Sequence, residues 1–460
     1  MSTPPPKLDI KNVQGDILEG LGKKHQVFHF FSIRDATNFR RNLRAFIPLI
    51  TDTTEAKKFH QTIKEAKKEA SLIGKPLELL ENSGVNISFT QKGLLALGIN
   101  DDIRDDIFKA GMLKDAPELG DKTEVDWDPK FKKDIHGVII VTANSKAILD
   151  ATLAGIKVIF LATIIDVKTL FGHTRPGPED GHEHFGFNDG LTQPAVKDVD
   201  AGVIKEPNED PVRQGIVLLG REGDDVPRPT WALDGSFLAF RYLKQLVPEF
   251  DNFLETNALH IPADMLGARL VGRWKSGAPV VLTPTRDDPT LAHAQDFAFN
   301  PASQEKCPFA AHIRKTNPRG DLPSTVRETR RIIRRGIAFG PEVRDDERKA
   351  KKSSQDPLWE RGLLFACYQS NLGNGFHFMQ KQWANNRAFP PTGAANPPVP
   401  DAGIDPIIGV GAPRDMVGAN AADPTKVLDF SQQWVVPKGG EYFFSPSIPA
   451  LNNTFVLPLH

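Results

Sequence analysis

The sequence GHEHFGFNDGLTQP, residues 181–194, separates two similar series of predicted elements and carries the most distinctive polar motif of the chain. Its glycines and its proline predict a tight loop rather than a core helix or strand. Asp189 follows two phenylalanines and precedes a glycine, in the spacing Gly186-x-x-Asp189-Gly190. This spacing is typical of a loop that presents a reactive acid and also of an Asx turn that caps the next element. From these residues alone, both interpretations stay open.

The part of the chain before this loop alternates strand-like and helix-like patterns. We expect strands at 25–33, 85–90 and 134–143, and helices at 34–50, 54–71, 91–97 and 145–154. Strands interrupted by helices in a β-α-β-β-α-β order are typical of a ferredoxin-like α+β unit with an antiparallel sheet.

The part after the loop repeats this order of elements. Here we expect strands at 235–243, 336–340, 362–369 and 441–445, helices at 245–258, 263–274 and 375–386, and a long surface loop at 389–415. No sequence identity between the halves is visible, so a duplication is inferred from element order alone. The sequence predicts two α+β, ferredoxin-like domains, 1–205 and 206–460.

Composition narrows the class of protein. The chain of 460 residues is 40% hydrophobic and 25% charged, with a net charge of −1. A nearly neutral chain predicts neither a nucleic-acid partner nor binding to an anionic membrane. Two cysteines, Cys307 and Cys367, are too few for a disulfide framework and lack zinc-type spacing. We expect both to be buried thiols.

The beginning of the chain lacks a basic segment followed by an apolar run, so we expect no secretory leader. No stretch approaches the roughly 20 apolar residues that a membrane span requires. We therefore expect a cytoplasmic or unconventionally exported protein. Oligomeric state is open between monomer and homodimer.

His312 lies in the segment CPFAAHIRKTNPR, residues 307–319, after two small alanines. An imidazole with little bulk beside it can face a flat metal macrocycle, and haem iron is commonly held by one proximal histidine. The alternative is a hydrogen-bonded loop histidine. Arg314 is a candidate partner for a haem propionate, because guanidinium matches a carboxylate in a bidentate manner.

The segment RRIIRRG, residues 330–336, brings four arginines into a β-like pattern. A peroxidase needs a base that moves the first proton of peroxide and a cation that stabilises charge as the O–O bond breaks. Asp189 and one inward-pointing arginine would supply both. A solvated basic face is the alternative, and it suits Arg330 and Arg331 better than Arg334.

Several blocks in order carry a resemblance to a known family. They are NVQGDILEGLGKKHQ (12–26), GFNDG (186–190), GSFLAFRYLKQLVPEF (235–250), AAHIRKTNPR (310–319), RRGIAFG (334–340), GLLFACYQ (362–369) and VLDFS (427–431). Together they resemble the dye-decolorising peroxidases, a family of haem enzymes, and in particular its larger fungal members. The resemblance spans nearly the whole chain.

The resemblance implies two ferredoxin-like domains whose sheets face each other, with one haem b held mainly by the second. It implies that His312 is the proximal iron ligand and that Asp189 is the distal acid and base. Arg334 matches the distal arginine, although Arg335 is a rival because the register of an arginine pair is uncertain by one. Asp429 matches the acid that accepts the N–H of the proximal imidazole and strengthens its donation to iron.

The resemblance also implies that Leu363 and Phe365 line the distal pocket. It implies an enzyme that reduces hydrogen peroxide and oxidises bulky dyes and phenols by single electrons. The alternative function is a haem-binding or haem-handling protein without turnover. Asp189 with an arginine favours the enzyme, because an unpaired buried acid is costly to desolvate and serves no storage site.

Bulky substrates need a route for electrons to the surface. Trp383, among polar neighbours in a predicted amphipathic helix, is our candidate, and we expect one exposed edge; a packing role is the alternative.

The acidic residues Glu342, Asp345, Asp346 and Glu347 suggest a manganese(II) route, because hard oxygen ligands suit that ion; a solvated turn is the alternative. His182 and His184 give too few ligands for a zinc site.

Overall fold

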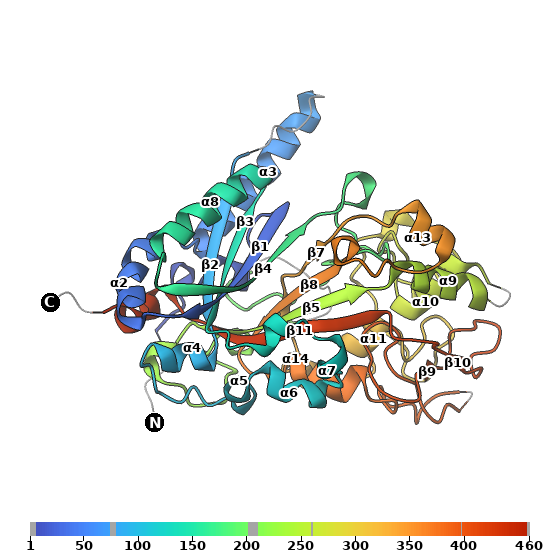
Figure 1. The fold of residues 1–460 in the computed structure, drawn as a ribbon. Helices are drawn as coiled ribbons and strands as arrows, with labels where there is room; N and C mark the ends of the chain where they lie inside the picture. Colours follow the sequence, from blue (N-terminus) through green and yellow to red (C-terminus); the bar gives the residue numbers. More distant parts are fainter. Residues whose placement is uncertain (1–5, 74–79, 201–209, 259–260, 397, 458–460) are drawn as a thin grey trace.

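The computed structural model describes residues 6–73, 80–200, 210–258, 261–396 and 398–457 (Figure 1). The first half contains the strands β1 (His25–Ile33), β2 (Ser83–Phe89), β3 (Gly137–Ala143) and β4 (Ile164–His173), with the helices α2 (Ala36–Phe46), α3 (Thr53–Ile73) and α8 (Lys146–Ile159). The strands pair antiparallel in the order β4-β1-β3-β2. This is the ferredoxin-like topology that the first half of the sequence predicts; β4 is a strand that the sequence patterns missed.

The second half repeats the topology. Its elements are β5 (Ser236–Gln245), α9 (Val247–Asn257), α10 (Ala263–Val271), β6 (Ile333–Arg334), β7 (Ile337–Phe339), β8 (Gly362–Gln369), α14 (Phe376–Phe378), η9 (Met379–Ala384) and β11 (Val435–Ser445). The strand order is β11-β5-β8, followed by β6 and β7, both of which pair with β8. The expected repeat of a ferredoxin-like unit is therefore confirmed.

The two halves form one closed body. A single residue pair, Phe89 with Phe444, joins β2 to β11, so nine of the described strands, β1 to β8 and β11, make one sheet. At the other edge β4 approaches β7 closely: a Cβ on Gly172 would lie 2.3 Å from Cγ2 of Ile337. Only a residue without a side chain permits this approach.

Aromatic rings fill the space between the four-stranded and five-stranded halves of this sheet, which fold over each other. The ring of Phe240 lies 4.7 Å from that of Phe28 and 5.0 Å from that of Phe30, centroid to centroid. Phe30 also lies 6.1 Å from Phe443. Residues of β1 thus pack on residues of β5 and β11, so the strands of the two halves face each other as expected. Ring contacts of this kind add to the free energy of burial.

Helix starts follow from local sequence. An Asp35 carboxylate oxygen accepts the N–H of Asn38 at the start of α2, and the Ser145 hydroxyl accepts that of Ile148 at the start of α8. Such N-caps satisfy amide groups that the helix itself leaves free. Gly272, in the left-handed region at φ +94°, ends α10 three residues earlier than the pattern predicts.

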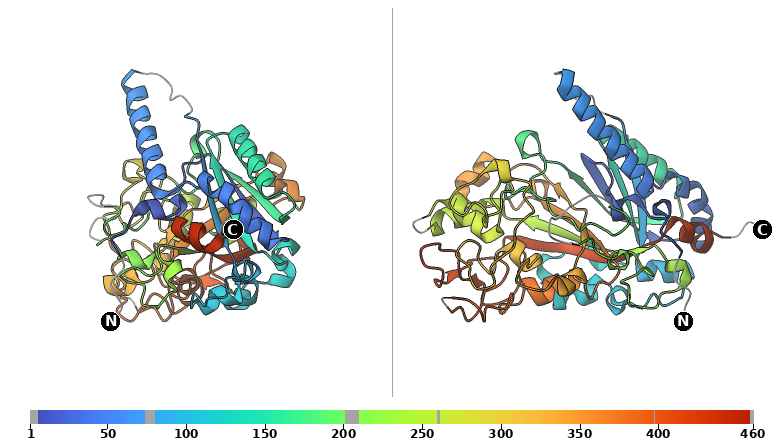
Figure 2. Two further views of the ribbon diagram at one scale, coloured as in Figure 1. Left: turned by 90° about the vertical axis from the view of Figure 1, so that its left-hand side faces the viewer. Right: turned by 180° about the vertical axis from the view of Figure 1, so that it is seen from behind.

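Long helix α3 extends away from the rest of the molecule (Figure 2). Its basic residues Lys64, Lys67 and Lys68 are exposed, as expected of a solvated face. Of the helices within the described residues, none is long and apolar enough to cross a membrane. The boundary that we expect after residue 205 lies outside the described residues.

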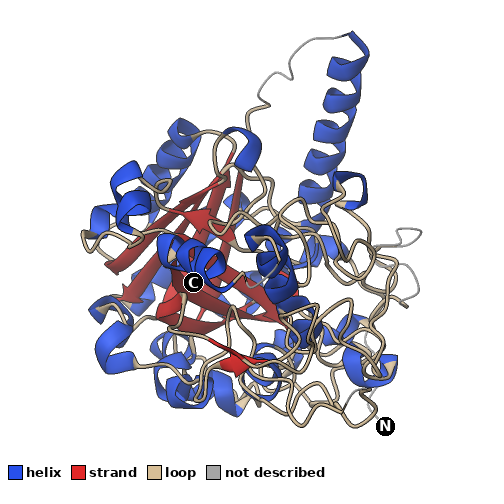
Figure 3. Ribbon diagram, turned by 90° about the vertical axis from the view of Figure 1, so that its right-hand side faces the viewer, coloured by secondary structure: helices blue, strands red, loops and turns tan. Residues whose placement is uncertain are grey.

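Loops and short helices make up much of the second half, beside the strands (Figure 3). The short helices of the chain are α1 (Gly15–Leu18), α4 (Gln91–Ala96), α5 (Asp106–Ala110), α6 (Met112–Leu119), α7 (Thr123–Asp126), α11 (His312–Thr316), α12 (Ser324–Glu328), α13 (Asp345–Ala350) and α15 (Ile448–Ala450). A small ladder joins β9 (Asp415–Met416) to β10 (Leu428–Asp429). The loops of the second half surround the cavity described next.

Candidate active site

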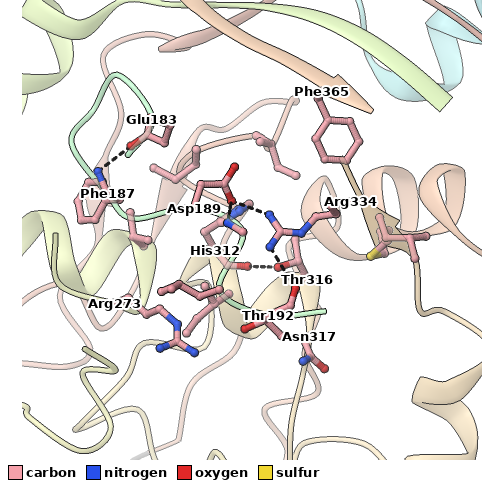
Figure 4. A pocket seen from close by; sticks show the side chains of 18 of the residues that line it. Glu183, Phe187, Asp189, Thr192, Arg273, His312, Thr316, Asn317, Arg334 and Phe365 are labelled. Carbon is pink, nitrogen blue, oxygen red and sulfur yellow. Dashed lines mark hydrogen bonds and ion pairs between the residues drawn. The ribbon is translucent and has the colours of Figure 1, made fainter. Parts of the chain in front are cut away.

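A cavity of about 260 Å³ lies where the 187–194 loop meets α11, β6 and β8 (Figure 4). Its walls are mostly apolar, and they include Phe187, Leu243, Val271, Ile313, Leu363, Phe365, Met379, Ile407 and Ile408. Leu363 and Phe365 alternate with the buried Leu364 and Ala366 along β8, because successive side chains of a strand point to opposite faces. Leu363 and Phe365 both line this cavity, and their place on the distal side of a haem stays a prediction.

The loop that carries Asp189 is held by a carboxylate. Glu183 accepts the backbone N–H groups of Phe185 and Phe187, each at 2.9 Å. Gly186 and Gly190 adopt φ values of +89° and +75°, which only glycine adopts at no steric cost. The tight loop that the glycines predict therefore forms, and it places Asp189 on the cavity wall.

Asp189 is paired with Arg334 on the wall of the cavity. Nη1 of Arg334 lies 2.7 Å from a carboxylate oxygen of Asp189, and Figure 4 draws this pair among the residues that line the cavity. Burial by itself would raise the pKa of Asp189, but the Arg334 guanidinium holds that pKa below its ordinary value. The carboxylate is therefore ionised at neutral pH.

Arg334 is positioned by the loop that follows Asp189. Its backbone N–H donates to the Gln193 side chain at 3.0 Å, and its backbone carbonyl accepts from the same side chain at 2.9 Å. The rival Arg335 points away and donates to the backbone carbonyls of Asp16 and Leu18. Because successive side chains at β6 point to opposite faces, only one of the two arginines faces the cavity.

His312 begins α11 and also lines the cavity. Its Nδ1 lies 2.8 Å from a carboxylate oxygen of Asp405, which is fully buried. The other oxygen of Asp405 accepts the N–H groups of Ile407 and Ile408. Burial acts against both charges, yet their mutual attraction raises the pKa of His312 and lowers that of Asp405. Nε2 is the ring nitrogen that remains available to a metal.

The prediction that Asp429 is the partner of His312 is wrong. Asp429 is exposed on the two-residue strand β10, opposite Asp415 of β9. Asp405 lies in the proline- and glycine-rich loop predicted at 389–415, in the segment GIDPIIG. An aspartate before a proline is typical of a turn, so the local sequence does not indicate that Asp405 is the partner of a histidine.

The prediction that Arg314 contacts a bound carboxylate at the cavity is also wrong. Its guanidinium makes two hydrogen bonds to Asp321, at 2.7 and 2.8 Å, and one to the Cys307 carbonyl. The side chain is 1% exposed and is used to hold the 300–321 segment together. The arginines on the cavity wall are instead Arg273, Arg319, Arg330, Arg331 and Arg334.

Arg330 is partly buried, contrary to the expected solvated face. It donates to the Asn374 side chain and stacks over the ring of Phe378.

The buried state of Cys307 and Cys367 is confirmed, and burial raises the pKa of the Cys307 thiol to about 12. Neither thiol is a nucleophile at neutral pH.

Trp383 differs from expectation in its exposure. It is 4% exposed and stacks on Phe389 with the ring centroids 5.0 Å apart. No edge of this ring is available to a bulky molecule in solution. The segment η9 that carries it packs against α11, the helix of His312.

Two of the acidic residues considered for manganese form ion pairs with arginines. Glu342 pairs with Arg175, and Glu347 pairs with Arg361, each at 2.6 Å. Nε2 of His184 donates to the Phe339 carbonyl. In the described part of the chain, no group of three or more histidine, cysteine, aspartate or glutamate residues could hold a metal ion.

The cavity suits a haem. It offers one imidazole whose Nδ1 is already bonded to a buried carboxylate, apolar walls for a flat ring system, and several arginines that match propionate groups. An acid paired with an arginine lies beside the same space. His312 is the only histidine among the residues that line this cavity within the described chain.

Comparisons with known proteins agree with this geometry. The chain matches two family models, the DyP dimeric alpha+beta barrel domain over residues 12–176 and the C-terminal domain of Dyp-type peroxidases over residues 183–389. It is 42% identical to a dye-decolorizing peroxidase of Mycena epipterygia, covering 97% of this chain and 86% of that protein. It is 30% identical to the multifunctional dye peroxidase DyP2 of Amycolatopsis, covering 96% and 95%.

Solved structures give the same result. A mutant of the dye-decolorizing peroxidase of Pleurotus ostreatus is 43% identical, with a TM-score of 0.89 over 98% of this chain and 100% of that one. A dye-decolorizing peroxidase whose heme pocket was engineered for asymmetric sulfoxidation is 39% identical, with a TM-score of 0.85 over 97% and 100%. The chain therefore belongs to the DyP-type peroxidases, a family of haem enzymes, and resembles the fungal dye-decolorising members over nearly its whole length.

Proposed function

We propose that this protein binds one haem b per chain through His312 and uses hydrogen peroxide to oxidise bulky dyes and phenols by single electrons. The observation that carries the proposal is the pair of Asp189 and Arg334, 2.7 Å apart on the wall of the cavity that His312 lines. A site that only stores haem gains nothing from an ion pair at this position.

The bound haem supplies the iron that takes electrons from one substrate and gives them to peroxide. Asp189 is ionised, so its carboxylate accepts the first proton of peroxide and returns it to the departing oxygen. Arg334 keeps that carboxylate ionised and stabilises the negative charge that develops on the same oxygen. His312 donates its Nδ1–H to Asp405, which orients the ring and increases its basicity.

Leu363 and Phe365 restrict the space next to Asp189, so small peroxides enter more easily than large organic molecules. A related dye-decolorizing peroxidase, 40% identical, has been solved in complex with 2,6-dimethoxyphenol, which supports phenols as one substrate class. Manganese(II) is left out of the proposal, because acidic residues considered for it are paired with Arg175 and Arg361.

The test is the response of the haem-loaded protein to one equivalent of hydrogen peroxide. We expect the haem absorbance band to change within the mixing time and to return when a phenol is added. An unchanged band would favour the alternative, a haem-binding protein without turnover.

A further inference from the structure

The side chain of Gln193 takes the place of a neighbouring strand beside β6. The two residues of β6, Ile333 and Arg334, pair with β8 on one side, and no other described strand pairs with β6. On the open side the Gln193 amide accepts the N–H of Arg334 at 3.0 Å and donates to the carbonyl of the same residue at 2.9 Å. An antiparallel strand would make the same two bonds. One side chain therefore completes the backbone pairing of Arg334.

A strand of two residues does not define its own register. A shift by one residue turns every side chain to the opposite face, and here it would exchange Arg334 with Arg335. Both bonds from Gln193 go to backbone groups of Arg334, so they fix the register in which Arg334 faces Asp189. Arg335 is held on the other side, because its guanidinium donates to two backbone carbonyls of α1, at 2.7 and 2.8 Å.

Gln193 belongs to the loop that carries Asp189 and lies four residues further along the chain. The same loop adds a third contact, from Nη2 of Arg334 to the carbonyl of Thr192 at 3.3 Å. The loop thus provides the acid and also the groups that place the arginine beside it. Among the described residues that line the cavity are Thr192 and Pro194 but not Gln193, so Gln193 acts through Arg334.

We propose that Gln193 is a positioning residue that keeps Arg334, rather than Arg335, beside Asp189. The inference rests on the proposed function, since it takes this ion pair as the group that handles the proton and the charge of peroxide. Without the two bonds from Gln193, Arg334 remains in the chain but its backbone is free to shift. A misplacement of about 1 Å can slow a reaction by roughly 100-fold.

Gln193→Met removes both bonds and keeps the length of the side chain, because methionine is unbranched like glutamine and carries no N–H group. We expect the second-order rate constant of the haem-loaded protein for hydrogen peroxide to fall by roughly 10- to 100-fold. The constant for a small phenol should stay at the wild-type value, since the ion pair acts on peroxide. Steady-state kinetics with both substrates varied separates the two constants. A general loss of folded protein would lower both.

A double-mutant cycle shows whether Gln193 acts through Arg334. In the Arg334→Leu background no guanidinium remains to be positioned, so the addition of Gln193→Met should leave the peroxide rate constant unchanged. Effects of the two substitutions that simply add would mean that Gln193 acts independently of Arg334, which contradicts the inference.

Gln14→Met is the matched control. The Gln14 side chain makes the same pair of bonds to Ile87 of β2, accepting its N–H at 2.8 Å and donating to its carbonyl at 2.9 Å. Gln14 is 1% exposed, and neither residue is among the described residues that line the cavity. We expect Gln14→Met to lower the thermal stability at least as much as Gln193→Met does and to leave the peroxide rate constant at the wild-type value. An equal fall of that constant in both variants would refute a specific role for Gln193.

Hydrogen exchange followed by mass spectrometry gives a readout that does not depend on turnover. The peptide that contains β6 should exchange faster in Gln193→Met than in the wild type, because the Arg334 amide loses its acceptor, while the peptide of β2 should not change. Unchanged exchange in β6, or an equal fall of the peroxide and phenol constants, would overturn the inference. A wild-type peroxide constant in Arg334→Leu would overturn the proposed function instead, and the exchange of β6 would then decide the role of Gln193 in the register.

Discussion

Nδ1 of His312 and a carboxylate oxygen of Asp405 lie 2.8 Å apart, although 93 residues separate them in the chain. Asp405 is fully buried and receives two further backbone N–H groups, from Ile407 and Ile408. A carboxylate held in this way cannot turn away from the imidazole. The electron donation of His312, the proposed iron ligand, therefore depends on a residue from the long loop after η9.

Asp405→Asn should retain haem and raise the ferric/ferrous potential, because the amide does not draw the Nδ1 proton and the less anionic ring stabilises ferric iron less. The measurement is a spectroelectrochemical titration. Asp429→Asn is the matched control, since Asp429 is exposed on β10, and its potential should equal that of the wild type. A shift in Asp429→Asn with none in Asp405→Asn would restore the partner inferred from the motif.

Asp189→Asn should keep the fold and the haem but slow the reaction with hydrogen peroxide by roughly 10²–10³, the usual loss for one well-placed electrostatic group. The amide has the shape of the carboxylate but does not accept the proton of peroxide. Stopped-flow absorbance with limiting peroxide measures the rate. Asp180→Asn, an exposed carboxylate just before the same loop, is the control, and wild-type speed in Asp189→Asn would remove the acid–base role.

The pH dependence of that rate should depend on Arg334. The pKa of Asp189 in the fold lies below its ordinary value. The carboxylate is therefore ionised at any pH above the ordinary pKa of an aspartate, and it becomes protonated only as the pH falls through the lowered pKa. Arg334→Leu leaves the burial of Asp189 uncompensated, which raises that pKa. We expect the acid limb of the rate, followed from about pH 3 to pH 8, to move to higher pH. Superimposable acid limbs would contradict this coupling.

His312→Ala should lose haem or hold it loosely, because no other histidine lines the cavity among the described residues. The ratio of haem absorbance to protein absorbance after gel filtration measures retention. His293→Ala, in an exposed loop, should retain a full complement. Full retention in His312→Ala would require a different ligand.

Trp383→Phe should slow oxidation of a bulky dye more than that of a small phenol, with peroxide reactivity unchanged. We expect the cavity lined by Leu363 and Phe365 to exclude a bulky dye, and Trp383 lies on η9, the segment that packs against α11. Because Trp383 is 4% exposed, it would act as an interior relay rather than as a contact surface. Trp359→Phe, a partly exposed tryptophan under Arg344, is the comparison; equal losses for dye and phenol in Trp383→Phe would exclude the relay.

The sequence by itself determined the fold class, the repeated order of elements and the residues that are candidates for binding or catalysis. Apolar periodicity and caps such as Asp35 and Ser145 are local properties, so they specify most helices and strands. The glycine spacing around Asp189 specified a tight loop, because glycine is the residue that adopts positive φ angles, as Gly186 and Gly190 do, without a steric penalty. Strand β4 was missed because partly exposed and polar residues interrupt its pattern.

Only the tertiary structure decided which partners these residues have. Arg334 rather than Arg335 faces Asp189 because adjacent residues at a strand point to opposite faces, and a sequence does not state its register. Asp405 rather than Asp429 meets His312, and Arg314 turns to Asp321, because long-range packing brings distant loops together and buries those carboxylates. The exposure of Trp383 likewise depended on Phe389, whose ring covers it. Pairing and burial are properties of the whole chain, so they became visible only when the two halves were packed.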